Sequence, residues 1–179
     1  MEPAENAIHL LKGKERAGAF SNLVRQYQER LYWHIRKMVL NHDDANDLLQ
    51  NTFVKAWNAL DSFRGESQLS TWLYRIATNE TLTFLSSKKN SLVSAGEMEE
   101  SMYQNLQADS YFNGDEAQLK LQKAILTLPE KQRLVFNMRF YEDMPYERMS
   151  EILDTSVGAL KASYHHAAKK IEDFFNEKE

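Results

Sequence analysis

Apolar residues recur every three or four positions through most of this chain, and no segment alternates apolar and polar residues with a period of two. The first spacing places apolar side chains along one face of an α-helix, whereas a half-buried strand requires the second. Only six Gly and three Pro interrupt the 179 residues, so the helices can be long. The pattern therefore predicts an all-α fold without a sheet, with a core in one domain or two small ones.

The first group of helices is expected between residues 17 and 90. One stripe at helical spacing comprises Phe20, Leu23, Val24, Tyr27, Leu31, Ile35 and Met38. Asp43 or Asp44 is a good N-cap for a second helix, whose inward residues are Leu48, Leu49, Phe53, Ala56, Trp57 and Leu60. A polar loop at 64–67 precedes a third helix, whose apolar residues are Leu69, Trp72, Leu73, Ile76 and Phe84. These three helices make a compact first domain.

The second group is expected between residues 117 and 176. Pro129 and Pro145 each stand where a helix can begin, because proline suits the first helical position. The tight turn Asp154-Thr155 leads to Ser156, which can cap the last helix. The apolar stripe of that helix is Val157, Leu160, Tyr164, Ala167, Ile171 and Phe174. A short helix, a tight turn and a longer helix form a helix-turn-helix, although pattern alone also fits any helical hairpin.

Residues 91–116 differ from both groups. They are Ser-rich, contain Glu97, Glu99, Glu100, Asp109, Asp115 and Glu116, and carry no Lys or Arg. We expect a flexible acidic linker with partial helix at most, or alternatively one more surface helix. The chain has 26 acidic residues, and without these six there remain 20 against 22 basic ones. The two helical groups are thus slightly basic, and an acidic segment joins them.

Composition limits the classes of function. The chain has no Cys, which excludes disulfides and thiolate metal sites and fits a reducing cytosol. We see neither a signal peptide nor an apolar stretch long enough to span a bilayer, and expect a cytoplasmic protein. The net charge of −4 argues against a protein that coats nucleic acid unaided, since phosphate neutralisation supplies most non-specific affinity.

Three surface patterns carry chemistry. The outer face of the last helix shows small residues at its start and then Lys161, His165, His166 and Lys169, a face that suits a DNA groove although it has no Arg. The second helix has a mostly uncharged polar face with an exposed Val54, which could dock on another protein. Rings near residues 57–74 flank the polar loop, and such a surface could stack unpaired bases or simply be a core beside a loop.

Metal sites are disfavoured. His165 and His166 are adjacent on a helix and point about 100° apart, so they do not easily ligate one ion. His42, Asp43, Asp44 and Asp47 resemble a ligand cluster, but the aspartates have a simpler role at a helix N-terminus. We therefore expect no metal and no cofactor, and nothing in the spacing indicates an enzyme.

Four blocks resemble those of one family: DDANDLLQNTFVKAWNAL, FRGESQLSTWLYRIATNETLTFL, LPEKQRLVFNMRFYEDMPYERMSEIL and SVGALKASYHHAAKKI. In this order and spacing, from about Phe20 to Phe174, the chain is similar to bacterial RNA polymerase sigma factors of the extracytoplasmic-function (ECF) subgroup. The resemblance implies a sigma region 2 at 17–90, an acidic linker at 91–116 and a sigma region 4 at 117–176. It also implies core RNA polymerase (clamp and flap) and promoter DNA as partners, and commonly an anti-sigma factor.

The resemblance implies three sets of site residues. The polymerase clamp would be bound by Asp47, Leu48, Gln50, Asn51, Phe53, Val54 and Trp57. The opened −10 element would be held by Phe63, Arg64, Ser67, Gln68, Tyr74, Arg75 and Asn79. The −35 element would be read by Ser156, Val157, Gly158, Ala159, Lys161, Ser163, His165, His166 and Lys169. The flap would meet Leu134, Phe136 and Met138.

Ser163, His166 and Ala168 stand where many relatives have Arg, so base reading must depend on backbone, small side chains, His, Lys and groove shape. Three alternatives stay open: a stand-alone helix-turn-helix regulator, a helical enzyme around His42 and its neighbouring aspartates, and a decoy that only binds other proteins.

Overall fold

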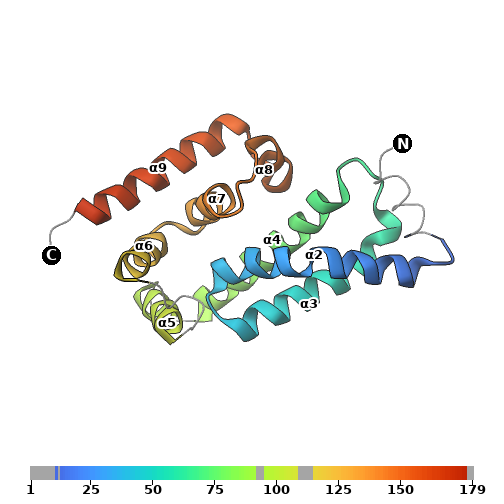
Figure 1. The fold of residues 1–179 in the computed structure, drawn as a ribbon, viewed down its shortest axis with the longest axis horizontal. Helices are drawn as coiled ribbons and strands as arrows, with labels where there is room; N and C mark the ends of the chain where they lie inside the picture. The colour runs from blue at the N-terminus through green and yellow to red at the C-terminus, as the bar shows by residue number, and fades with distance from the viewer. Residues whose placement is uncertain (1–10, 12, 92–94, 109–114, 177–179) are drawn as a thin grey trace.

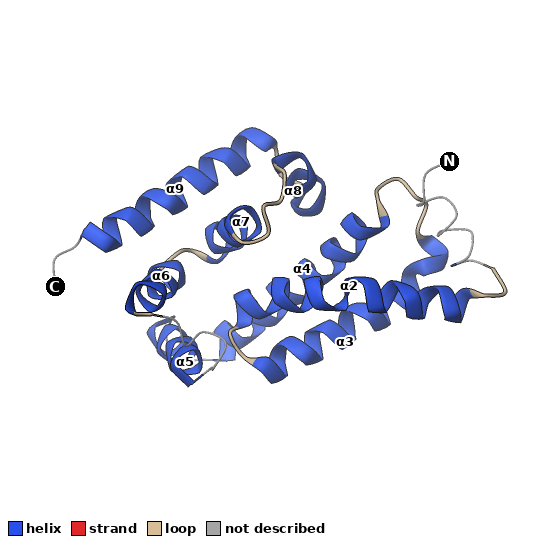
Figure 2. Ribbon diagram, in the orientation of Figure 1, coloured by secondary structure: helices blue, strands red, loops and turns tan. Residues whose placement is uncertain are grey.

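The computed structural model describes residues 11, 13–91, 95–108 and 115–176. Within these ranges the regular elements are helices and there is no strand (Figure 1, Figure 2). The predicted all-α fold is confirmed, and so is its organisation as two helical modules. The helix labels begin at α2.

The first module consists of α2 (Arg16–Val39), α3 (His42–Ala59), the 3₁₀ turn η1 (Leu60–Ser62) and α4 (Leu69–Ser91). The three α-helices pack on one another. The residues in its core that are at most 1% exposed include Leu31, Ile35, Met38, Ala56, Leu73 and Ala77. All of them except Ala77 belong to the stripes expected from the spacing, because burying apolar area is what holds an amphipathic helix in place.

The turn between α2 and α3 depends on two adjacent residues. Leu40 takes a left-handed conformation (φ 55°) and ends α2. The side chain of Asn41 accepts a hydrogen bond from the backbone N–H of Asp44 at 2.9 Å, and so caps α3. The prediction of Asp43 or Asp44 as N-cap is therefore wrong. Both acids lie in the first turn, where the helix dipole favours negative charge.

The second module consists of α6 (Glu116–Leu126), α7 (Glu130–Phe140), α8 (Tyr146–Leu153) and α9 (Val157–Asn176). Pro129 and Pro145 occupy the caps directly before α7 and α8, one position earlier than predicted. Asp154 ends α8 in a left-handed conformation (φ 49°). Ser156 Oγ accepts from the N–H of Ala159 at 3.2 Å, which confirms it as the cap of α9. Helices α8 and α9 form the expected helix-turn-helix.

Part of the acidic segment is more ordered than a tether. Residues Ala95–Ala108 form α5, which packs on α6. Met102 is 6% and Leu106 1% exposed, and both belong to the main apolar core. The expectation of a flexible linker is thus corrected for this stretch. The sequence carried a weak signal for it, since Met102 and Leu106 are four residues apart on one helical face.

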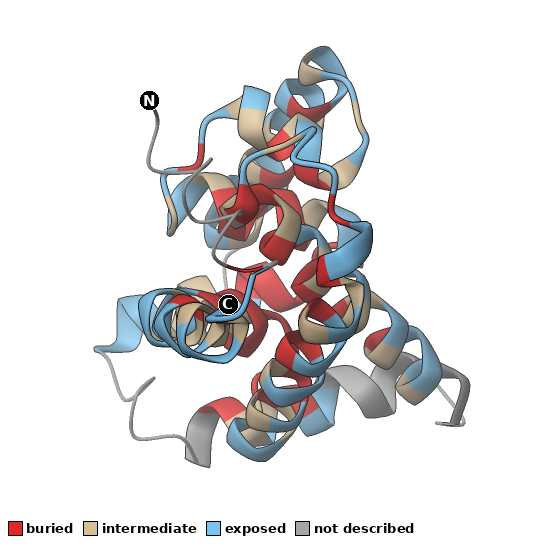
Figure 3. Cartoon of the chain, turned by 90° about the vertical axis from the view of Figure 1, so that its right-hand side faces the viewer, coloured by how far each residue is buried: buried red, intermediate tan, exposed pale blue. Residues whose placement is uncertain are grey.

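The two modules touch each other. Helix α8 packs on α4, and α7 packs on α2 (Figure 1). One apolar cluster runs from the first module into the second and includes Leu134, Met138 and Met149. A smaller cluster lies between α6, α7 and α9. In Figure 3, buried positions lie on the inward sides of the helices, and exposed positions cover their outer faces.

The packing of α5 has a measurable consequence. Leu106→Ala removes a fully buried side chain and should lower the free energy of unfolding by about 2–5 kcal/mol. Ser101→Ala, at an exposed position of the same helix, should change it by less than about 0.5 kcal/mol. Urea unfolding followed by circular dichroism measures both values. An unchanged stability in Leu106→Ala would show that α5 does not pack in solution.

Candidate protein-binding and nucleic-acid interfaces

The outer face of α3 is the first candidate surface. Asp47, Gln50 and Asn51 are exposed, and Val54 is 59% exposed. Val54 is an aliphatic side chain that is open to water and is surrounded by mostly uncharged polar residues, which is unusual for a merely solvated face. The neighbouring Lys55 is engaged by Glu80 of α4, which leaves the centre of the face without a cation.

Three residues predicted for the same surface lie elsewhere. Leu48 and Phe53 are 5% and 9% exposed and belong to the core. Trp57 is half-buried, with its ring 5.1 Å from that of Phe20 and the Arg16 guanidinium 4.5 Å above it. The prediction of Leu48 and Phe53 as surface contacts is therefore corrected: they hold α3 in place from behind.

The polar loop after η1 is the second candidate surface. Arg64, Glu66 and Gln68 are exposed and Ser67 is half-buried, while Gly65 takes a φ of 74° that favours glycine. The loop therefore presents a cation and several hydrogen-bonding groups.

The aromatic residue beside this loop faces inward. Phe63 was expected at the DNA surface, but it is 6% exposed and its ring lies 4.8 Å from that of Trp72. The sequence left open whether these rings form a base-stacking surface or a core beside a loop. The structure shows that the Phe63–Trp72 pair belongs to the core and that the exposed groups at this position are those of the loop.

Helix α4 continues from the loop and carries Tyr74, Arg75 and Asn79. Arg75 and Asn79 are exposed. Tyr74 is only 5% exposed, which corrects the expectation of a surface ring. Its ring lies 5.0 Å from that of His34 in α2 and 5.1 Å from the guanidinium of Arg148 in α8. Burial raises the pKa of the Tyr74 phenol, and the Glu142 carboxylate adds to the rise.

The outer face of α9 is the third candidate surface. The exposed residues among those predicted for DNA are Ser156, Gly158, Ala159, Lys161, His165, His166 and Lys169; Val157 and Ser163 are half-buried. The buried stripe is Leu160, Ala167 and Ile171, on the opposite side. No atom lies within 4 Å of the position that a Cβ would take at Gly158, so the surface of the helix is open there. That face can approach a groove closely.

The expected flap residues are interior. Leu134, Phe136 and Met138 are at most 4% exposed. The surface of α7 instead shows Phe140, which is 50% exposed and stacks on Phe136 at 5.0 Å. Phe140 lies two residues beyond the buried Met138, and on a helix this separation places the two side chains on nearly opposite faces. The outward orientation of Phe140 could therefore be predicted from the sequence.

Histidines and aspartates at the start of α3 have local partners. His42 Nδ1 lies 2.8 Å from the Tyr32 hydroxyl, and its Nε2 lies 2.9 Å from Asn46 Nδ2. Asp44 accepts from Lys88 of α4 at 3.1 Å. Among the residues that the structure describes, no three His, Cys, Asp or Glu side chains gather as a metal site would require. The described helices include none long and apolar enough to cross a membrane.

Comparison with known families gives two matches in chain order. Residues 23–91 match the family Sigma-70 region 2, and residues 118–171 match Sigma-70, region 4. The first match contains the α3 face, the loop and α4, and the second contains the helix-turn-helix.

Curated relatives agree with these matches. The chain is 32% identical over 162 residues to the ECF RNA polymerase sigma factor SigW of Bacillus subtilis, covering 86% of this chain and 87% of the relative. It is 30% identical over 178 residues to the ECF RNA polymerase sigma-E factor of Escherichia coli, covering 90% and 88%.

Two solved structures share the fold. One is the sigma factor RpoE in complex with the anti-sigma factor NepR from Bartonella quintana, with a TM-score of 0.66, 21% identity and coverage of 89% of this chain and 98% of that one. The other is CnrH in complex with the cytosolic domain of CnrY, with a TM-score of 0.67, 22% identity and coverage of 98% and 96%.

These findings first define a class: the protein is a transcription initiation factor that acts with core RNA polymerase on promoter DNA, and it is not an enzyme. The chain belongs to the sigma-70 family of RNA polymerase sigma factors, in its extracytoplasmic-function group. Nothing in the comparisons supports a stand-alone regulator.

Proposed function

We propose that each of the three exposed surfaces has a separate role in transcription initiation. The α3 face binds the clamp of core polymerase, the loop with α4 holds the opened −10 element, and α9 reads the −35 element. The observation that carries this division is the contrast between the surfaces: a mostly uncharged polar face with an exposed Val54 on α3, and a face of small residues, His and Lys on α9. Protein surfaces suit the first, and a DNA groove suits the second.

The α3 contact is made by the four exposed residues. Val54 supplies an apolar anchor, and Gln50 and Asn51 supply hydrogen bonds beside it. Leu48, Phe53 and Trp57 act indirectly, because they fix the helix against α2. The exposed ring of Phe140 on α7 supplies an anchor for the polymerase flap.

The −10 contact requires separated strands. A flipped base needs a pocket that stacks it and groups that hydrogen-bond its edge. Arg64, Ser67 and Gln68 supply donors and acceptors on the loop, and Arg75 and Asn79 continue them along α4. Phe63 supports the loop from below through Trp72. Stabilising extruded bases shifts an opening equilibrium that costs a few kcal/mol per unstacked step.

The −35 contact lies at the start of α9. Gly158 and Ala159 let the backbone approach base edges, while Lys161 and Lys169 meet phosphates. The imidazoles of His165 and His166 and the hydroxyl of Ser163 supply further hydrogen-bonding groups on the same face. A helix without Arg binds duplex weakly alone, so core polymerase must contribute affinity and hold the two modules at a fixed spacing.

The family also suggests an inhibitor and a place of action. The sigma factor RpoE, which shares this fold, was solved in complex with the anti-sigma factor NepR, and CnrH, of the same fold, was solved with the cytosolic domain of CnrY. We infer that this chain is likewise held by an anti-sigma protein, and that it acts in the cytoplasm, where core polymerase meets the chromosome, without inserting into a membrane.

Run-off transcription with core polymerase on a genomic fragment library tests the proposal. We expect discrete transcripts whose upstream sequences share two elements at constant spacing, and no transcripts without the chain. Discrete duplex binding by the pure chain, together with no effect on polymerase, would instead indicate the stand-alone regulator and overturn the proposal.

Asp47→Arg should weaken association with core polymerase at least about tenfold, because a bulky cation replaces a contact at the centre of the α3 face. Asp173→Arg makes the same charge change at an exposed position of α9 and should leave association unchanged. Fluorescence titration of labelled variants with core polymerase measures both, and circular dichroism checks the fold. Equal affinities in the two variants would remove α3 from the interface.

Lys161→Glu should weaken promoter binding by the holoenzyme, because a phosphate contact is lost and a repulsion is added. The slope of log affinity against log salt should fall by about one. Association with core polymerase should not change. Lys131→Glu, an exposed cation of α7 with the same charge change, is the control. If both variants lose promoter affinity equally, the start of α9 is not the reading surface.

A further inference from the structure

Arg16, the first residue of α2, joins two elements that lie far from it in the chain. Its Nη1 donates to both carboxylate oxygens of Asp61 in η1, at 2.9 and 3.0 Å, and its Nη2 donates to the backbone carbonyl of Trp57 in α3 at 2.8 Å. The same guanidinium lies 4.5 Å from the centre of the Trp57 ring. Neither Arg16 nor Asp61 belongs to the site residues that the sequence alone indicated.

This contact has more support than an ordinary surface ion pair. Isolated exposed pairs contribute little, because water competes for both charges and two side chains must be ordered. Here Asp61 is exposed, but Arg16 is half-buried and applies one planar group to a carboxylate, a carbonyl and an aromatic ring. Helix α3 has no basic residue in its last turn, so Arg16 also supplies the cation that a helix C-terminus favours. Arg16 therefore holds the end of α3 and η1 together.

The polar loop begins directly after this contact. The N–H of Phe63 donates to the Leu60 carbonyl at 3.2 Å and closes η1. At the far end of the loop, the Trp72 N–H donates to the Gln68 carbonyl at 3.0 Å, and the Trp72 ring packs on Phe63. The side chains of residues 64–68, between these two ends, are exposed or half-buried. Where they lie therefore depends on where η1 is held.

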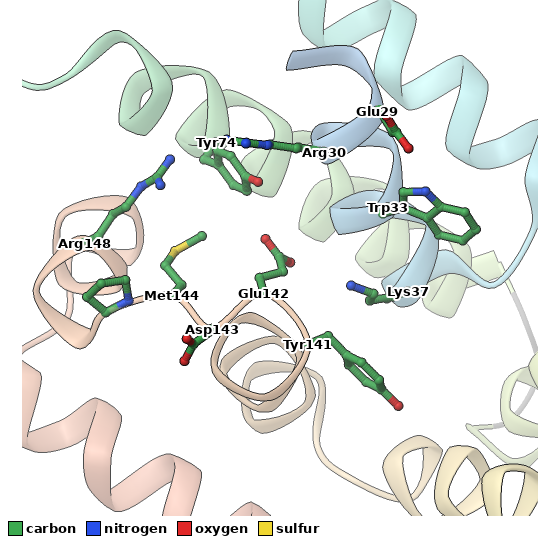
Figure 4. A pocket seen from close by; sticks show the side chains of 11 residues that line it. Glu29, Arg30, Trp33, Lys37, Tyr74, Tyr141, Glu142, Asp143, Met144 and Arg148 are labelled. Atoms are coloured by element: carbon green, nitrogen blue, oxygen red, sulfur yellow. The ribbon is translucent and has the colours of Figure 1, made fainter. Parts of the chain in front are cut away.

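The contact between the two modules lies elsewhere in the molecule. The cavity between them is lined by residues such as Trp33 of α2 and Tyr74 of α4, and by Arg148 of α8 (Figure 4). Neither Arg16 nor any residue of 63–68 belongs to that lining. The contacts of Arg16 described above are made within the first module, so a substitution there should not change how the modules meet.

We propose that Arg16 is a positioning residue for recognition of the −10 element: by holding η1, it keeps the polar loop in its strand-binding arrangement before DNA arrives. The proposal rests on the role in −10 binding proposed above for the loop. Preorganisation favours binding, because groups that are already ordered lose less freedom when the ligand binds. If the released loop takes the competent arrangement about one time in ten, its apparent affinity for the opened strand falls about tenfold.

Two substitutions remove the contact from its two ends. Arg16→Ala removes the guanidinium, and Asp61→Ala removes the carboxylate and should act in the same direction. The double variant should be no more impaired than Arg16→Ala, because the two residues act as a pair. Arg25→Ala is the control: it makes the same change at an exposed position of α2, where the arginine donates to Asn22 of its own helix at 2.8 Å. Circular dichroism verifies that each variant retains its helices.

The first measurement uses the full-length chain without polymerase. Because the chain has no Cys, Glu66→Cys in the loop can carry a single nitroxide label, whose mobility is read by electron paramagnetic resonance. We expect Arg16→Ala and Asp61→Ala to make this label more mobile and Arg25→Ala to leave it unchanged. A second label site, Glu147→Cys on the exposed side of α8, should not respond to any of the three. Equal mobility at residue 66 in all proteins, or an equal response at residue 147, would overturn the proposal.

The second measurement uses the holoenzyme and a promoter obtained by run-off transcription, with 2-aminopurine in its −10 element to report opening. Arg16→Ala should lower the equilibrium constant for opening about tenfold. Association with core polymerase, and binding to a duplex that contains only the −35 element, should not change, whereas a merely structural role would lower all three together. A mobile loop with unchanged opening, or an equal loss of opening in Arg25→Ala, would overturn the positioning role.

Failure of the proposed function would be a different result. In that case the wild type with core polymerase would yield no promoter-dependent transcripts. Failure of the positioning role would instead leave transcription by the wild type intact and show no effect of Arg16→Ala on the label or on opening. The label experiment requires no polymerase, so it decides in either case whether Arg16 holds the loop.

Discussion

The two proposed helical binding surfaces, on α3 and on α9, depend on amphipathic helices that bury one apolar stripe each. On α9 the buried stripe of Leu160, Ala167 and Ile171 fixes which side chains face outward. On α3 the burial of Leu48, Thr52 and Phe53 has the same effect. Because the core determines the rotation of each helix, the outward residues are positioned without contributing to the core themselves. A sigma factor can therefore vary its outward faces while keeping its fold.

The interface between the modules follows a different rule. It combines an apolar strip with polar contacts that cross from one module to the other, such as His34 with Glu142 and Arg75 with Glu151. Polar contacts of this kind are selective and moderate in strength, because each exchanges a bond with water for a bond within the protein. Interfaces between domains of one chain commonly have this mixed character, and relative motion of the two modules is the ordinary expectation for such an interface.

The sequence predicts the helices well because their spacing is a local property. The stripes of α2 and α9 and the cap at Ser156 required knowledge of only a few neighbouring residues. The errors have a different origin. Tyr74 is covered by residues far away in the chain, His34 and Arg148, and the Phe63 ring packs on Trp72 across the polar loop. The spacing within one helix contains neither piece of information. The cap at Asn41 was missed because Asn, Asp43 and Asp44 are all good cap residues in one short stretch.

Helix α5 gives the acidic segment an adjustable length. Its 14 residues span about 21 Å as a helix but up to roughly 48 Å when extended. Folding or melting this single element therefore changes the reach of the connection by more than 25 Å. With α5 packed on the core, the connection is short and favours the compact arrangement. With α5 unwound, the same residues form a longer, negatively charged connection. The largest distance between the two modules therefore depends on the stability of one helix.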